Sequence, residues 1–236
     1  MADVSRGTSQ WLQQIADDLA ALGLLLRGGF NFGPDEDSPP ATGSERAQAV
    51  LLVGQAGAAP WPHFRCWQKR TQVSINPLDT WSREVIGEIA LRIGARSVSP
   101  NDRPFLPFQQ WAMRAEGIKP SPLGILMHPQ YGLWHAYRGA LLLDHEVSIQ
   151  VPEDVNHLCD TCVGKPCLKA CPVNAYSLQG FDYLACLEHV RGPEGQPCRT
   201  QGCLDRNACP HGAEYRYPED VQAYHMAAFA SLPSAL

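Results

Sequence analysis

The sequence lacks a long apolar run and lacks a basic patch. Its stretch LGLLL near the N-terminus is far shorter than the about 20 apolar residues that a membrane-spanning helix needs. The 19 lysines and arginines are outnumbered by 24 acidic residues, and phosphate binding requires a basic face. Asp17 and Asp18 interrupt the N-terminal apolar residues, which is not typical of a secretory signal. We therefore expect a cytoplasmic protein with no membrane or nucleic-acid partner.

Cysteine is nearly missing from the first two thirds of the chain, where Cys66 stands alone. The other eight of the nine cysteines lie between residues 159 and 209. A chain of 236 residues that is 44% hydrophobic can build a core without disulfides. Because the cytoplasm keeps thiols reduced, the crowded cysteines indicate metal binding or redox chemistry.

The apolar pattern predicts an α/β or α+β core domain over residues 1–154 and a small cysteine-rich domain over residues 155–236. The boundary is placed near residue 154 because the composition changes there to cysteine, proline, glycine and short segments. Residues 30–47 and 58–77 are expected to be irregular, since they are rich in proline, glycine or charge. The expected elements are a helix over 10–22, a buried strand over 49–57, an amphipathic helix over 81–93, a strand over 95–100, a helix over 109–117, a pair of strands over 124–132 and 137–149, and a helix over 218–232.

The cysteines form two related motifs. The first is C-x2-C-x4-C-x3-C-P and the second is C-x11-C-x4-C-x5-C-P. Three thiolates followed by a fourth before proline is the ferredoxin arrangement, in which the fourth serves the other cluster of a pair. Gly164 and Pro166 are expected to turn the long x4 loop. We therefore predict two [4Fe–4S] clusters, with Cys159, Cys162, Cys167 and Cys209 on one, and Cys171, Cys186, Cys198 and Cys203 on the other.

Alternatives to crossed iron–sulfur ligation stay open at this point. Each motif can supply its own cluster without crossing. All-thiolate zinc sites also use C-x2-C pairs, although only one such pair occurs here. Disulfides or free thiols are a further alternative. The two Cys-Pro endings favour clusters over zinc.

The first domain carries other candidate residues. Cys66 is read as a buried structural thiol, with a reactive thiol near a cofactor as the alternative. Each nearby histidine is a satisfied core or surface group, or else a proton donor to a substrate. The aromatic residues beside them are core residues, or else the walls of a pocket for a flat macrocycle. These residues are His128, His135, His145, Tyr131, Trp134 and Tyr137.

The cysteine block resembles the epoxyqueuosine reductase family, in which a lone cysteine also stands between a Cys-Pro motif and a later pair. The segments GILMHPQYGLWHAYRGALLLD and AVLLVGQAG are similar to segments of the core of that family. The wider superfamily includes reductive dehalogenases and cobalamin-processing proteins. The resemblance implies a nitroreductase-like α+β core that binds cobalamin, followed by a dicluster ferredoxin-like domain that feeds it electrons.

The sequence also departs from that family. The stretch SVSPNDRPF does not match the VDS-P type segment that carries the family's catalytic acid, and KPSPLGI stands in place of a Gly-Trp-x-Gly-Lys segment. We therefore do not transfer the queuosine reaction and assign no catalytic residue. We expect a divergent iron–sulfur oxidoreductase that takes electrons from an external low-potential donor and passes them to a substrate or corrinoid. A non-enzymatic ferredoxin-type carrier active in electron transport, and a zinc-stabilised binding module, are the alternatives.

Overall fold

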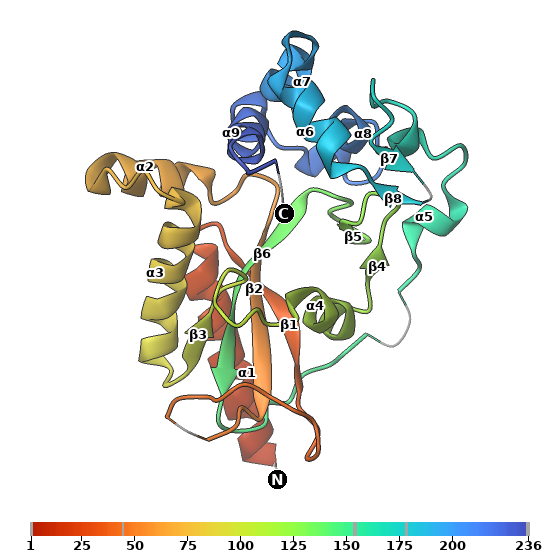
Figure 1. Ribbon diagram of the computed structural model, residues 1–236. Helices are drawn as coiled ribbons and strands as arrows, with labels where there is room; N and C mark the ends of the chain where they lie inside the picture. The colour runs from red at the N-terminus through yellow and green to blue at the C-terminus, as the bar shows by residue number, and fades with distance from the viewer. Residues whose placement is uncertain (1, 44, 153–154, 178, 235–236) are drawn as a thin grey trace. The chain divides into compact units, whose positions relative to one another are not determined.

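The chain divides into two compact units in the computed structural model, which describes residues 2–43, 45–152, 155–177 and 179–234. The first unit comprises residues 1–117 and 136–155, and the second comprises residues 118–135 and 156–236. The first unit combines helices with a sheet whose outer pairs are antiparallel, so the fold is of the α+β class that the family resemblance implied (Figure 1). No described helix is both long enough and apolar enough to cross a membrane.

A four-stranded sheet with the order β1-β2-β6-β3 forms the centre of the first unit. Strand β1 (Leu25–Asn31) pairs antiparallel with β2 (Ala49–Ala56), and β3 (Arg96–Val98) pairs antiparallel with β6 (His135–Leu143). Seven of the eight residues of β2 are buried, which explains its continuous apolar sequence. The register of β1 shifts between Leu26 and Gly29, so Arg27 and Gly28 lie opposite the single residue Leu52 and form a bulge.

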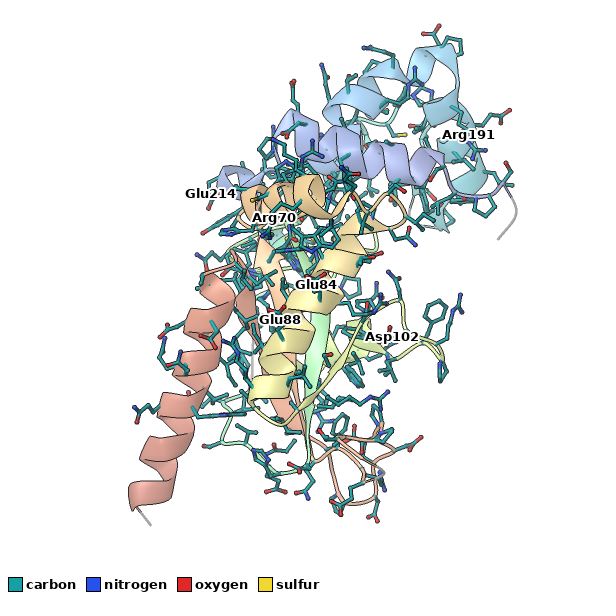
Figure 2. All side chains as sticks on the ribbon, turned by 90° about the vertical axis from the view of Figure 1, so that its left-hand side faces the viewer. Arg70, Glu84, Glu88, Asp102, Arg191 and Glu214 are labelled. Atoms are coloured by element: carbon teal, nitrogen blue, oxygen red, sulfur yellow. The ribbon has the colours of Figure 1, made fainter. Side chains whose placement is uncertain are left out.

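Four helices accompany the sheet. Helix α1 (Ala2–Ala20) contacts β1 and crosses behind the sheet in Figure 1, and α4 (Phe108–Glu116) packs on β1 and β2. Helix α3 (Pro77–Arg92) packs against β3 and against α2 (Trp61–Thr71). The indole Nε1–H of Trp67 on α2 donates to the carboxylate of Glu84 on α3, at 3.0 and 3.1 Å from its two oxygens. Figure 2 shows Glu84 and Glu88 along α3.

A buried ion pair joins the sheet to α4. Arg27 is 3% exposed and makes two hydrogen bonds of 2.7 Å to the carboxylate of Glu116. The hydroxyl of Tyr137 donates to the same carboxylate, and burial raises the pKa of this tyrosine far above its usual range. By contrast, the pair of Arg83 and Asp102 at 3.0 Å is half exposed; Asp102 is labelled in Figure 2.

The second unit is built from short elements around the cysteines. Its first segment, residues 118–135, was expected in the core domain. The predicted pairing of the strands at 124–132 and 137–149 is wrong, because β5 pairs with β4 while β6 joins the large sheet. The elements are β4 (Lys119–Pro120), β5 (Leu126–Met127), α5 (Leu158–Thr161), η1 (Pro166–Leu168), β7 (Tyr176–Ser177), β8 (Gly180–Phe181), α6 (Tyr183–Arg191), η2 (Pro193–Gly195), α7 (Gln196–Gln201), α8 (Leu204–Asn207), η3 (Ala213–Tyr215) and α9 (Glu219–Ala230).

Candidate functional site

The eight clustered thiols of the second unit line two separate cavities, four in each. The cavities are small, with a volume of about 10 Å³ in the first and about 30 Å³ in the second. Besides the sulfur atoms, the walls are mostly apolar, with Ser121, Lys165 and His211 in the first and Tyr176 and His189 in the second. The first set is Cys159, Cys162, Cys167 and Cys209, and the second is Cys171, Cys186, Cys198 and Cys203. The structure therefore groups the thiols across the two motifs, with each Cys-Pro cysteine beside the other motif.

The first three thiols are positioned by a tight loop between α5 and η1. Gly164 has φ +74° and Lys165 has φ +40°, so two successive residues adopt the left-handed conformation that reverses the chain. Pro166 then begins η1 at a position where its missing N–H is not needed. The ammonium of Lys165 donates to the carbonyl of Cys159 at 2.7 Å and closes the loop. The x4 spacing is thus long enough for this turn.

Residues 118–135 cover the first cavity. Leu123, Met127 and Leu133 form one buried cluster with the thiols of Cys159, Cys167 and Cys209. The segment is held by a close approach of two backbones. A Cβ added to Gly132 would lie 2.0 Å from the carbonyl oxygen of His211, and one added to Gly212 would lie 2.3 Å from the backbone of Tyr131. Glycine is therefore required on both sides of this contact.

Helices α6, α7 and α8 position the second set. Asp182 caps α6 because its side chain accepts a hydrogen bond of 2.9 Å from the Ala185 N–H, and this helix carries Cys186. Cys198 lies in α7, and Cys203 is the residue before α8. This arrangement gathers thiols from three short helices around one cavity.

Burial controls the protonation of the thiols. Desolvation, followed by repulsion from neighbouring thiolates, raises the pKa of Cys159 to about 11 and that of Cys186 to about 12. Burial likewise raises the pKa values of Cys167, Cys198, Cys203 and Cys209. Without a cation these six groups keep their protons at neutral pH, so a bound metal would displace them.

Backbone N–H groups are directed at several of the sulfur atoms. The Ala175 N–H donates to the sulfur of Cys171 at 3.5 Å, and the main-chain N–H of His211 donates to Cys209. The backbone at Asp205 and Arg206 does the same for Cys203. Such donors stabilise thiolates and are a recurrent feature around iron–sulfur clusters.

Asp205 links the two motifs. Its side chain is fully buried, and Oδ1 accepts hydrogen bonds from the main-chain N–H groups of Ala170 and Cys171 at 2.9 and 2.7 Å. Burial raises the pKa of this carboxyl, and the two hydrogen bonds oppose that shift. Asp205 therefore orients the end of the first motif from α8, a role that no sequence motif indicated.

The histidines singled out in the sequence have structural partners. His135 is 5% exposed, and its Nε2 lies 2.8 Å from the carbonyl oxygen of Leu126. Nδ1 of His128 accepts hydrogen bonds of 3.1 Å from two main-chain N–H groups in the following turn, and its ring stacks on Tyr131. His145 is exposed and lies 2.8 Å from Asp144. All three fit the reading as satisfied core or surface groups.

The three aromatic residues are divided between the two units. Trp134 is fully buried in the second unit, where its ring contacts Tyr217 at 5.4 Å and lies beneath the guanidinium of Arg206 at 4.4 Å. Tyr137 belongs to the first unit. The burial of Trp134 fits its reading as a core residue. Cys66 is exposed on α2, which corrects its reading as a buried structural thiol.

The first unit has two open grooves of the size that small-molecule sites usually have. One, of about 640 Å³, runs along α3 and β3 and includes Arg83, Glu84, Glu88 and Arg96. Figure 2 shows Glu84 and Glu88 on this face of α3. The other, of about 600 Å³, is lined by parts of residues 32–48 together with Glu146.

Among the described residues, no group of three or more His, Cys, Asp or Glu side chains is arranged for a single metal ion.

Comparison with known proteins supports the fold assignment alone. A search with protein-family models finds no match to this chain, and a search of curated proteins finds none either. Among solved structures, the chain is similar to a selenomethionine-labelled epoxyqueuosine reductase, with 12% identity, a TM-score of 0.53, and coverage of 92% of this chain and 69% of the other. It also resembles an epoxyqueuosine reductase solved with an epoxyqueuosine-modified tRNA-Tyr stem loop, with 13% identity, a TM-score of 0.48, and coverage of 96% and 70%. The chain thus shares a fold with the first of these enzymes.

Proposed function

We propose that this chain is an iron–sulfur oxidoreductase that holds two [4Fe–4S] clusters in its second unit. The observation that carries the proposal is the sorting of eight thiols into two cavities of four, across the two sequence motifs. One cluster would be held by Cys159, Cys162, Cys167 and Cys209, and the other by Cys171, Cys186, Cys198 and Cys203. This is the ligand exchange that two-cluster ferredoxins use.

The residues around the cavities fit such clusters. All eight donors are thiols, which are the usual ligands of cubane clusters. The apolar walls exclude water, and backbone N–H groups point at the sulfur of Cys171, Cys203 and Cys209. When bound, the clusters would supply one-electron transfer. The chain's part is to hold them, shield them and set their electrostatic surroundings.

The first unit is proposed as a nitroreductase-like core that binds the electron acceptor, either a small substrate or a corrinoid. The shared fold with an epoxyqueuosine reductase and the two grooves of the first unit support an acceptor site there. The cobalamin assignment rests on the sequence resemblance. The proposed reaction takes electrons from an external low-potential donor in the cytoplasm, with no nucleic acid involved.

Metal analysis and cysteine variants test the proposal. Anaerobic production is expected to yield about eight iron and about eight sulfide per chain, as two four-iron clusters require. Cys209→Ser is expected to alter the paramagnetic resonance signal of the cluster that Cys159→Ser alters, and Cys171→Ser that of the cluster that Cys186→Ser alters. Stoichiometric zinc with negligible iron would overturn the proposal. If each Cys-Pro variant instead affects the cluster of its own motif, the crossed ligation is wrong.

A ferredoxin-type electron carrier is the second candidate function. The burial of Trp134 favours it, because this residue belongs to the core, and the alternative of a macrocycle-pocket wall loses one of its three aromatic residues. Mixing the reduced, iron-loaded protein with a panel of cobalamins separates the two candidates. A spectral change of the cobalt centre supports a corrinoid-linked reductase. Its absence with every cobalamin, together with rapid reduction of a redox protein, supports the carrier.

A further inference from the structure

Two histidines that no motif singled out have buried ring nitrogens without a partner. Among the described residues, five buried side-chain nitrogen or oxygen atoms lack a hydrogen bond, and all five belong to the second unit. Two of them are Nε2 of His189 and Nε2 of His211. A buried polar atom without a partner costs free energy, so its presence calls for a physical explanation.

Each of these histidines belongs to the wall of a different cysteine cavity. His211 lines the first cavity and follows Cys209 by two residues. His189 lines the second and follows Cys186 by three residues on α6, which places both on one face of that helix. The two positions are unrelated in local structure. They share only an unpartnered nitrogen beside four thiols.

The backbone of each histidine is held close to another segment. A Cβ on Gly195 would lie 2.0 Å from the carbonyl oxygen of His189, and one on Gly132 would lie 2.0 Å from that of His211. Two other polar side chains of the first cavity wall have a partner: Lys165 donates to a carbonyl, and the Ser121 hydroxyl accepts from the Leu123 N–H at 3.2 Å. Nε2 of His211 differs from them because it is buried and has no partner.

We infer that the Nε2–H of His211 and that of His189 each donate a hydrogen bond to sulfur of the cluster in the adjoining cavity. The inference rests on the proposed clusters. Reduction adds one electron from an external donor and makes the cluster more negative, so an N–H donor stabilises the reduced form more than the oxidised form. Each histidine thus raises the reduction potential of its own cluster. They are positioning residues and transfer no proton.

Redox titration of the anaerobically prepared full chain, followed by paramagnetic resonance, tests this inference. His211→Leu is expected to lower the one-electron reduction constant of the cluster on Cys159, Cys162, Cys167 and Cys209 about tenfold, which is about 59 mV. His189→Leu is expected to do the same to the other cluster only. The Gln variants keep an N–H donor and are expected to recover part of each shift. His225→Leu, at a half-buried histidine that lines neither cavity, is expected to leave both potentials unchanged.

The outcomes separate this inference from the proposed function. A protein without iron overturns the function itself. Full iron content with unchanged potentials in both Leu variants overturns only the inference. Where a Leu variant fails to load iron, wild-type protein labelled with ¹⁵N-histidine decides the question. Pulsed resonance of the reduced clusters is expected to show coupling to a ring nitrogen, and its absence overturns the inference.

Discussion

Gly132→Ala is predicted to loosen the segment that covers the first cavity. Gly132 has φ +56°, and an added Cβ would lie 2.0 Å from the carbonyl oxygen and 2.6 Å from the carbonyl carbon of His211. Both contacts are with backbone, so no side chain can move aside. The substitution must separate residues 131–132 from residues 211–212, which follow Cys209.

Two costs add in this variant. Placing alanine in the left-handed conformation costs about 1 to 2 kcal/mol. Forcing an extra methyl group into a packed contact costs about 1 to 3 kcal/mol more. Gly124 provides the matched control, because it has φ +73° in the same segment and nothing within 4 Å of an added Cβ. Gly124→Ala therefore carries the first cost alone, and the difference between the two variants measures the clash.

The assay is the rate of iron release from anaerobic protein into a ferrous chelator. If local opening of residues 118–135 precedes release, the clash of about 1 to 3 kcal/mol makes Gly132→Ala about 5 to 150 times faster than Gly124→Ala. Hydrogen exchange is expected to rise in residues 118–135 and not in the strands of the first unit. Equal release rates in the two variants would refute the argument that this contact holds the cover in place.

Three further predictions concern the rest of the chain. Arg27→Met leaves the buried Glu116 carboxylate without its cationic partner and is expected to destabilise the first unit by about 3 to 5 kcal/mol. Arg83→Met, at the exposed pair with Asp102, is expected to cost about 0 to 1 kcal/mol. Urea unfolding followed by circular dichroism compares the free energies of unfolding of the two variants. A hydrogen bond from Arg114 lowers the pKa of Glu36 from its ordinary value of 4.5. The ionised Glu36 therefore stabilises the fold above pH 4.5, and this contribution is lost as the pH falls through the lowered pKa. Glu36→Gln is expected to flatten the acid limb of the curve of unfolding free energy against pH, and an unchanged limb contradicts this. In iron-loaded protein, an alkylating reagent is expected to modify Cys66 alone, because it is the exposed thiol outside both cavities; modification of many cysteines at the same rate would contradict the ligation scheme.

The sequence predicted elements whose apolar pattern is strong. Strand β2, helix α3 and the C-terminal helix α9 lie where the sequence predicted a strand and two helices. Helix α2 was missed because prolines at 60, 62 and 77 read as breakers, yet Pro62 lies in the first turn of α2 and Pro77 begins α3, where proline is tolerated. Strand β1 was missed because it contains two successive glycines, the first of which lies in a bulge. The first helix also begins earlier than expected, at Ala2.

The candidate site was predictable only in part. The division of the eight thiols into two sets of four follows from the spacing of the cysteines and the two Cys-Pro endings, so the sequence alone suggested this division. The cover formed by Leu123, Met127 and Leu133 is a contact between segments far apart in sequence, and such contacts leave no periodic signal. His211 and His189 had a weak signal, since both lie within three residues of a predicted ligand. A search of the neighbours of each cysteine for N–H donors would have found them.

Residues 118–135 make the chain cross between its two units three times, at residues 117–118, 135–136 and 155–156. A module acquired by joining one gene to the end of another is connected by a single crossing. The cysteine-rich unit therefore cannot be exchanged between proteins as a C-terminal tail, because its cover is encoded upstream, between α4 and β6.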